Sequence, residues 1–286
     1  MFRDLIFSFL IIFSTIFRRL NRDKIRVLAY HEIPNLKAFE KQLRWLKSNF
    51  NILDLDTFEQ CVAGKQKFPK NSLLITFDDG DYTMLSGGEL LKKLDIPAVV
   101  FVITGIIDTQ KPFWWRELRQ YLGEEEGKTK GRQLKQVLNE ERVRFLNNLR
   151  NQQNEQLIQA QLTTADLYQL EQNGVRVANH SHTHPMFNRV TAEELLQEMK
   201  STEDFFKNKN LSGYPYVAYP NGNFDPETEK IMEASGIRLG FLFDHQWNHP
   251  NQIHPLRISR IRTNTYDALP EFKVKVSGLH SKLMKS

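Results

Sequence analysis

Short apolar runs alternate with longer segments of helical periodicity, and this alternation constrains the fold more than any other feature of the sequence. Most of the runs are separated by segments whose apolar residues recur every three or four positions. Strands that alternate with helices pair in parallel, so the chain is predicted to be an α/β protein built on a parallel sheet. The predicted strands fall within residues 24–30, 51–55, 72–77, 98–102, 175–179, 216–219, 239–243 and 257–261.

Two helices carry clear boundary signals. Thr191 and Glu194 form a capping box before an apolar face. Asp225 and Pro226 suit the N-cap and first position of the next helix, and Gly236 can end it in a left-handed conformation.

One stretch, from about residue 112 to 162, interrupts the alternation because it is rich in Glu, Lys, Gln and Asn. It offers few apolar residues for a core of its own, so we expect a helical insertion within one domain that spans residues 23–286. A chain of 286 residues is long enough for a single α/β domain of this kind.

Composition excludes several classes of protein. Cys61 is the only cysteine, so neither an intrachain disulfide nor a thiolate metal cluster can form. The net charge of +5 is spread along the chain without a nucleic-acid-binding motif, and no nucleic-acid partner is expected.

The N-terminus carries an uncharged apolar run, residues 5–17, followed by five basic residues between positions 18 and 26. As a helix the run reaches only about 20 Å, shorter than the roughly 30 Å of a hydrocarbon core, and no small-residue cleavage site follows it. We predict that residues 1–22 form an uncleaved membrane anchor with a basic flank, and the membrane face stays open. A helix packed on the domain itself is the alternative.

Polar clusters directly follow three predicted strands: Thr-Phe-Asp-Asp-Gly at 76–80, His-Ser-His-Thr-His at 180–184 and Tyr-Pro-Asn-Gly at 219–222. In a parallel α/β barrel the loops after the strands converge on one face, where active sites lie. Neighbouring carboxylates and two histidines four residues apart supply a His, His, Asp ligand set with an open position. That set is typical of a catalytic divalent metal.

These motifs together resemble the polysaccharide deacetylases, the NodB-type domain of carbohydrate esterase family 4, over roughly residues 25–264. The resemblance implies a distorted (β/α) barrel of the NodB type in which Asp79, His180 and His184 hold the metal and Asp78 is the general base. Ser181 is expected to support the loop, and His182 to lie outside the metal site.

The third motif is similar to the family's substrate and oxyanion segment, here Tyr219, Pro220, Asn221 and Gly222, with the backbone N–H of Asn221 as the oxyanion donor. The chain departs from the family at Ala218, where an arginine often orients the base. We therefore expect another group to position Asp78.

The chain also departs from the family in its general acid. A late Leu-x-His segment usually supplies that acid in the family, and no such segment is visible after the last predicted strand. First and last strands of a nearly closed barrel are neighbours, so we predict that His31, after the first strand, protonates the leaving amine. His254 and His245 are the alternatives.

The resemblance implies a metal-dependent hydrolase that removes N-acetyl groups from an N-acetylhexosamine in a polysaccharide or a lipid-linked saccharide. Zinc is the expected ion, and cobalt, nickel or iron also suit the ligands. Trp114, or its neighbour Trp115, offers a flat surface for a sugar ring. A metal-dependent amidohydrolase or deformylase acting on another C–N bond and an inert glycan-binding protein are the rival functions.

Overall fold

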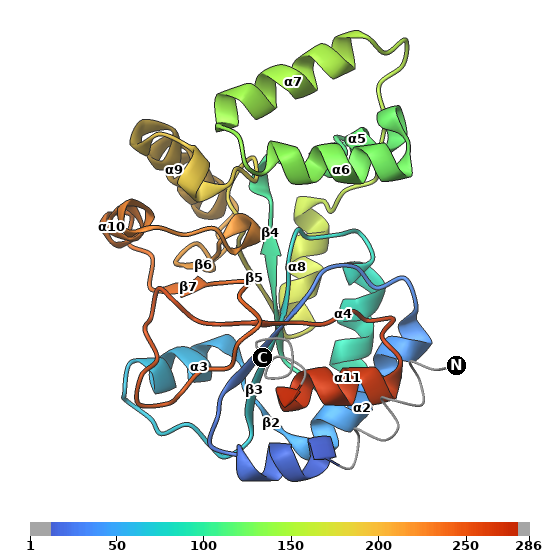
Figure 1. Ribbon diagram of the computed structural model, residues 1–286. Coiled ribbons are helices and arrows are strands. Elements are labelled where there is room, and N and C mark those ends of the chain that lie inside the picture. Colours follow the sequence, from blue (N-terminus) through green and yellow to red (C-terminus); the bar gives the residue numbers. More distant parts are fainter. Residues whose placement is uncertain (1–12, 280–286) are drawn as a thin grey trace.

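The structure, a computed structural model, describes residues 13–279 and contains an eight-stranded parallel sheet surrounded by helices (Figure 1). The strands are β1 (Arg26–Tyr30), β2 (Asn51–Ile52), β3 (Ser72–Phe77), β4 (Ala98–Val102), β5 (Val175–Asn179), β6 (Tyr216–Ala218), β7 (Leu239–Phe241) and β8 (Ile261–Arg262). The helices are α2 (Leu36–Asn49), α3 (Leu55–Val62), α4 (Met84–Lys93), α5 (Trp114–Leu122), α6 (Glu124–Leu134), α7 (Asn139–Asn151), α8 (Thr164–Gln172), α9 (Ala192–Asn208), α10 (Pro226–Ala234) and α11 (Leu269–Ser277). Three short 3-10 turns complete them: η1 (Thr104–Ile106), η2 (Phe187–Arg189) and η3 (Pro220–Gly222).

The sheet has the strand order β7-β6-β5-β4-β3-β1-β8, with β2 paired beside β3, and every pairing is parallel. A parallel bridge between Phe241 and Ile258 also joins the end of β7 to the segment before β8. The sheet therefore curls back on itself as a distorted barrel, and its first and last strands are neighbours. The predicted α/β barrel class is confirmed, and the carboxyl ends of the strands share one edge.

Alternate residues of each strand face opposite sides of the sheet. In β3, Ile75 packs outward against the layer of α2, α4, α8 and α11, whereas Leu74 packs inward with Phe58 of α3. The same alternation places Thr76 on the inner side, and Asp78 follows it two residues later. The sequence of β3 thus directs one carboxylate toward the barrel interior.

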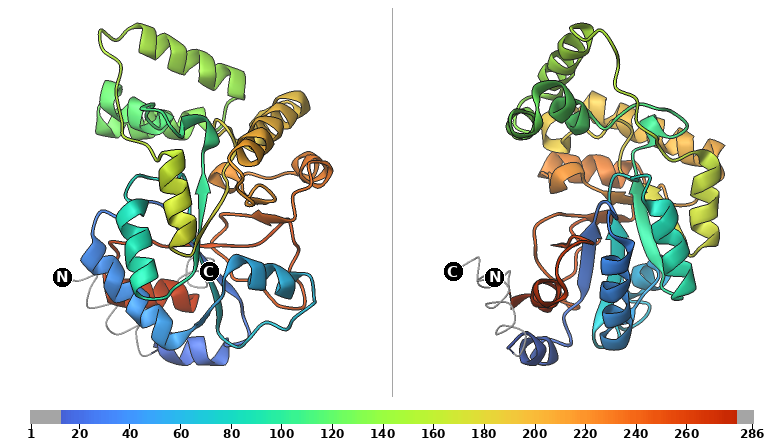
Figure 2. Two further views of the ribbon diagram at one scale, coloured as in Figure 1. Left: turned by 180° about the vertical axis from the view of Figure 1, so that it is seen from behind. Right: turned by 90° about the vertical axis from the view of Figure 1, so that its right-hand side faces the viewer.

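Helices α5, α6 and α7 lie between β4 and β5 in the sequence and sit beyond the carboxyl edge of the sheet (Figures 1 and 2). They enclose a small hydrophobic cluster that includes Trp114, Leu118 and Leu146, and Met186 from the loop after β5 completes it. The three helices are therefore joined to the barrel by apolar packing at the edge where the polar loops lie.

Most of the predicted anchor, residues 1–12, lies outside the described residues. Residues 13–20 are helical, and the Phe17 ring stacks on Trp247 with 5.7 Å between centroids. Arg18 donates a hydrogen bond of 2.9 Å to the Asn49 side chain. Among residues 13–279, none of the helices has both the length and the apolar character needed to cross a membrane.

Candidate active site

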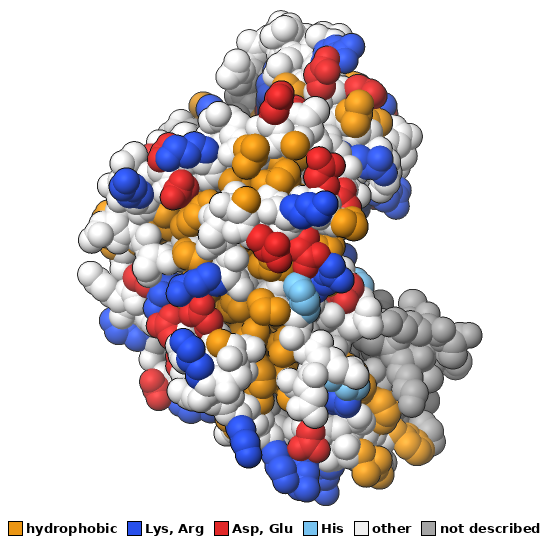
Figure 3. Space-filling model, turned by 90° about the vertical axis from the view of Figure 1, so that its left-hand side faces the viewer, with side chains coloured by type: hydrophobic (Ala, Val, Ile, Leu, Met, Phe, Trp, Pro, Cys, Tyr) orange, Lys and Arg blue, Asp and Glu red, His pale blue; other side chains and the backbone are white. Residues whose placement is uncertain are grey.

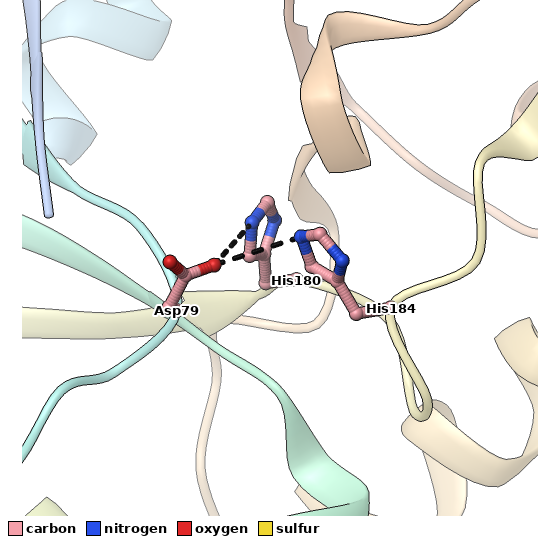
Figure 4. A group of neighbouring side chains, drawn as sticks. All are labelled: Asp79, His180 and His184. Carbon is pink, nitrogen blue, oxygen red and sulfur yellow. Dashed lines mark ion pairs between the residues drawn. The ribbon is translucent and has the colours of Figure 1, made fainter. Parts of the chain in front are cut away.

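Loops after β3, β5 and β6 bring the predicted polar clusters together at the carboxyl edge of the sheet. Asp79 comes from the first loop and His180 and His184 from the second, and their side chains point toward one another (Figure 4). Asp79 Oδ1 lies 3.4 Å from His180 Nε2 and 3.6 Å from His184 Nε2. One ligand atom from each residue lies within 4.8 Å of the others, and all three residues are buried.

The hydrogen bonding of His180 fits a bound cation. His180 Nδ1 lies 2.8 Å from the carbonyl oxygen of Ala218, which can only accept, so Nδ1 carries the proton. In the neutral ring, Nε2 then directs a lone pair toward the Asp79 carboxylate. Two electron-rich atoms facing each other in a buried site are stabilised by a metal ion between them, and the carbonyl partner of the other nitrogen is the usual support for such a ligand.

The charge balance of this cluster also favours a cation. Burial by itself lowers the pKa of His180, but the neighbouring Asp79 and Asp78 carboxylates outweigh it and raise that pKa. Burial, together with the nearby His180 charge, holds the pKa of His184 well below its usual value. The two carboxylates thus favour positive charge beside them, and Asp79, His180 and His184 together could supply that partner by holding a divalent metal ion.

The loop that carries the histidines is held by hydrogen bonds on both sides. The Ser181 hydroxyl accepts from the His184 N–H at 3.0 Å, as expected of a loop-supporting residue. From α9, Glu198 accepts from the N–H groups of His182 and Thr183, each at 2.9 Å. The sequence did not reveal this role of Glu198, because the residue lies on a different element, sixteen residues after His182. These bonds fix the direction of the two imidazoles.

The turn after Asp79 requires a glycine. Gly80 has a φ of +71°, and a Cβ built there would lie 2.9 Å from Cγ1 of Val102. Asp79 itself has a left-handed φ of 71°. Strain of this kind persists where the surrounding structure holds it, and here it aims the carboxylate at the histidines.

Asp78 is paired with Arg260, which sequence reasoning did not identify. Arg260 is fully buried, and its two terminal nitrogens donate to the two Asp78 oxygens at 2.6 and 2.8 Å. Its Nε donates to the carbonyl of Leu242 at 2.7 Å. Burial alone raises the pKa of Asp78, but the charge and hydrogen bonds of Arg260 outweigh it and hold that pKa below its usual value. Arg260, just before β8, is therefore the group that positions the Asp78 carboxylate, since Ala218 has no charged side chain to do so.

His31 lies at the mouth of the same site, directly after β1. It lines the cleft together with Asp78 and Asp79, and its ring is 5.7 Å from that of Phe243. The two alternatives do not line this cleft. His254 lies 3.5 Å from Glu229 of α10, and His245 is on the exposed loop after β7. The geometry favours His31 among the three candidate histidines.

The third motif divides into structural and cleft-lining residues. Tyr219 is buried and donates from its hydroxyl to the Leu256 carbonyl at 3.0 Å, and burial raises its pKa. Pro220 is also buried, in η3. Asn221 adopts φ 58° and lines the cleft, and Gly222 has a φ of +72° with Phe243 in close contact. The structure thus leaves Asn221 as the residue of this motif that faces the site, while Tyr219 supports the fold.

Only one of the two tryptophans reaches the cleft. Trp114 is buried against Arg142, whose guanidinium lies 5.2 Å from its ring. It lines a rear cavity of about 710 Å³, which Trp115 and His184 also line. Trp115 lines the cleft, and its ring is 4.9 Å from that of His184. The aromatic surface available to a substrate is therefore Trp115. His182 faces the rear cavity and contacts Thr104 at 3.0 Å, away from Asp79.

The cleft consists of two adjoining hollows of about 320 and 360 Å³, between the carboxyl edge of the sheet and helices α5 and α6. Both hollows are lined by His31, Asp79 and Trp115, and the larger also reaches Asp78 and both histidines. Figure 3 shows the outline of the molecule indented below its upper part, which is formed by the inserted helices. A carbonyl group in this cleft would meet the metal ligands, the buried carboxylate and His31 together.

Known proteins share both the sequence pattern and the fold. A family model described as polysaccharide deacetylase matches residues 65–240. The chain is 26% identical over 246 residues to a poly-β-1,6-N-acetyl-D-glucosamine N-deacetylase of Staphylococcus aureus (strain MSSA476), which covers 85% of this chain and 72% of that protein. Among solved structures it is similar to the Streptococcus pyogenes deacetylase PplD in complex with acetate (TM-score 0.64, 19% identity, 89% of this chain and 98% of that chain). It is also similar to IcaB from Ammonifex degensii (TM-score 0.64, 20% identity, 89% and 96% of the two chains).

Proposed function

The chain belongs to the polysaccharide deacetylase family, and we propose that it hydrolyses the N-acetyl group of an N-acetylhexosamine in a polysaccharide or a lipid-linked saccharide. The observation that carries this proposal is a buried carboxylate, Asp78, held by Arg260 and outside the ligand set, beside the cation-binding set of Asp79, His180 and His184 in one cleft. The relative from S. aureus is named for N-deacetylation of an N-acetylglucosamine polymer, which supports the substrate class.

Asp79, His180 and His184 would hold a divalent metal ion, and their nitrogen and oxygen atoms suit zinc first and cobalt, nickel or iron as well. When bound, such an ion supplies Lewis acidity for the amide carbonyl and lowers the pKa of a water molecule. Three protein ligands leave room for substrate and water, as a catalytic site requires.

Asp78 accepts the proton of the attacking water. Its oxygens lie in a fixed plane because Arg260 holds both of them, and the same pairing keeps the carboxylate ionised at neutral pH. Water oxygen then bonds to the carbonyl carbon, and we assign to the backbone N–H of Asn221, a residue that lines the same hollow, the stabilisation of the developing negative charge.

His31 donates a proton to the amide nitrogen as the C–N bond breaks. The acetic acid that forms gives its remaining proton to the amine, so acetate and the protonated amine are the products. The proton that Asp78 took from water returns to His31 and restores both groups for the next cycle. His31 suits this step because it lines the same hollow as the base and the metal ligands.

We also propose that residues 5–17 attach the chain to a membrane surface. Their apolar composition and the basic residues that follow them support this, and the helical residues 13–20 leave Phe13, Ile16 and Leu20 more than half exposed. Flotation of the full chain with anionic vesicles, beside a chain lacking residues 1–12, tests the attachment. Equal recovery of both chains with the vesicles would overturn it.

The experiment for the reaction is acetate release from N-acetylglucosamine oligomers by protein that has been stripped of metal and reloaded with zinc. Asp78→Asn should abolish the zinc-dependent release, whereas Asp204→Asn, on α9 in an ion pair with Lys200 outside the cleft, should not change it. Failure of zinc-loaded protein to release acetate from any N-acetylated saccharide would point to another amide, such as a formamide, or to a glycan-binding protein.

A further inference from the structure

Basic side chains outnumber acidic ones on the wall of the larger hollow. Its acidic side chains are Asp78 and Asp79, and both are already accounted for, by Arg260 and by the histidines. Its basic side chains other than histidine are Arg119, Lys128, Arg132, Lys135 and Arg262. The wall of the hollow therefore carries an excess of positive charge that the reaction itself does not use.

Four of these five cations have no carboxylate partner within residues 13–279. Lys128 is the exception, because Glu124 and Glu125 each lie 3.1 Å from its Nζ. Arg132 donates only to the hydroxyl of Thr129, at 3.1 Å. We call the four residues without a carboxylate partner the cation cluster: Arg119, Arg132, Lys135 and Arg262.

The helical insertion builds most of this cluster. Lys128, Arg132 and Lys135 are spaced i, i+4 and i+7 on and just after α6, so they share one face of that helix. Gly127 lets α5 come close, because a Cβ there would lie 2.5 Å from the Cα of Arg119. The close approach of the two helices places Arg119 beside the basic face of α6.

Lys135 and Arg262 carry the positive charge close to the catalytic residues. The Nζ of Lys135 donates to the Asn221 side chain at 2.9 Å, which ties α6 to the third motif. Partial burial lowers the pKa of Lys135, and the charges of Arg262 and Arg119 contribute in the same direction, against the opposing charge of Asp79. Like charges held this close repel one another, and a bound anion relieves that repulsion.

We propose that the cation cluster binds an anionic group, a phosphate or a carboxylate, that the substrate carries on or beside the N-acetylhexosamine being deacetylated. This inference rests on the proposed function and names its substrate class more narrowly. Guanidinium groups match the oxygen atoms of phosphate and carboxylate in pairs, whereas an uncharged polymer offers the cluster no partner.

The location of the charges gives the substrate a direction. In the adjoining hollow, Arg116 is neutralised by Glu32 at 3.2 Å and Asp81 at 2.7 Å. Arg119 and Arg262 line both hollows, whereas Arg132 and Lys135 line the larger hollow alone. Because Arg132 and Lys135 belong only to the larger hollow, all four cations of the cluster meet there, and the anionic group lies toward α6 when the acetamide faces Asp79. The amine product is a cation, and the same cluster repels it, which favours release after one deacetylation.

Three substrates with one backbone test the proposal: a neutral N-acetylglucosamine oligomer, the same oligomer bearing a phosphate ester, and one in which a uronic acid is the neighbouring sugar. The zinc-loaded protein should show a kcat/KM at least about fivefold higher for one anionic substrate than for the neutral one, since one kcal/mol corresponds to about that factor. The preference should fall as salt is added. The phosphate and uronic acid substrates identify which anion is used.

The double variant Arg119→Gln with Arg132→Gln should lose most of the preference, mainly through a higher KM for the anionic substrate. Arg144→Gln on α7 is the matched control, because its exposed side chain pairs with Glu140 and lies outside the cleft. An unchanged Tm shows that the double variant is folded. Binding of the phosphorylated oligomer to metal-stripped protein, measured by calorimetry, should weaken in the double variant and not in the control.

Two results distinguish failure of the anionic-substrate inference from failure of the proposed function. Equal kcat/KM for neutral and anionic oligomers, with no effect of the double variant on their ratio, would overturn the anionic substrate and leave the deacetylase function intact. Failure to release acetate from any of the three oligomers would overturn the proposed function, and the present inference with it.

Discussion

At the scale of single residues, the pair of Asp78 and Arg260 decides how the site works. A buried carboxylate needs a partner, and this one has a single arginine that holds both of its oxygens. The partner comes from the opposite end of the chain and reaches across the barrel interior, where its guanidinium also lies 5.6 Å from the ring of Phe101. The carboxylate is therefore ionised and fixed before substrate arrives.

Replacing Arg260 with Met should destabilise the protein by about 3–5 kcal/mol, because it leaves an uncompensated buried carboxylate. Without Arg260 the burial of Asp78 dominates, its pKa rises, and the acidic limb of the kcat/KM profile should move to higher pH. Since the pKa of Asp78 in the folded protein lies below its unfolded value, the stability difference from wild type should shrink as pH falls through the acidic range. Urea unfolding and pH–rate profiles measure both effects.

Arg257→Met is the matched control for Arg260, since Arg257 pairs with Glu229 on the surface and its side chain is 49% exposed. If both substitutions lower the free energy of unfolding equally, the buried pair of Asp78 and Arg260 does not have the stabilising role given to it.

His31→Ala should lower kcat by about 10²–10⁴-fold while zinc content stays at the wild-type level, because it removes the proton donor and no metal ligand. His254→Ala provides the comparison, as this histidine lies against Glu229 outside the cleft. If His31→Ala keeps the wild-type kcat and His254→Ala loses most of it, His254 is the general acid and His31 is not.

At the scale of elements, α9 supports the metal-binding loop through Glu198. Glu198→Ala removes the acceptor for the backbone of His182 and Thr183, so the two histidine ligands should lose their fixed direction. We expect zinc affinity to fall by about 10–100-fold, as is usual for groups that orient ligands. Competition with a chromogenic chelator measures the affinity, and Glu203→Ala on the same helix should leave it unchanged.

The sequence predicted the elements well where the local signals agree. Strands β3, β4 and β5 coincide with the apolar runs at 72–77, 98–102 and 175–179. The capping box of Thr191 and Glu194 is present, Asp225 caps α10 with Pro226 as its first residue, and Gly236 has a φ of +74°. Each of these features depends on contacts within a few residues, which a sequence displays directly.

Features that depend on distant contacts were missed. Arg260 stands in a short run that reads as an ordinary strand, and only the curl of the sheet brings it to Asp78, 182 residues away. The sequence also did not decide whether Trp114 or Trp115 reaches the cleft. Adjacent residues of a helix point in different directions, and the packing of that helix against its neighbours decides which one faces the cleft. The signal available for Arg260 was weak, because the segment 257–262 contains three arginines and nothing in the sequence separates the buried one from the other two.

At the scale of the whole molecule, the barrel and the inserted helices form the site jointly. The barrel supplies the metal ligands and the base, and α5 and α6 supply Trp115 and most of the cation cluster. This division separates the chemistry, which depends on the barrel loops, from selection of the substrate, which depends on the insertion.

Metal binding should also stabilise the folded chain, since its buried ligands converge only when β3 and β5 are assembled. Zinc added to the stripped protein should raise the Tm, and chelation should lower it. In His184→Ala the zinc-dependent shift should be much smaller. An equal shift in that variant would show that zinc acts at another place on the chain.

The most direct test of the central claim is a titration of metal-stripped protein with zinc, in which acetate release from N-acetylated oligomers is measured against zinc bound per chain. Release should rise in proportion to bound zinc and saturate at about one ion per chain, the number that one His, His, Asp site holds. Full release from the stripped protein, or no release at one bound ion per chain, would contradict it.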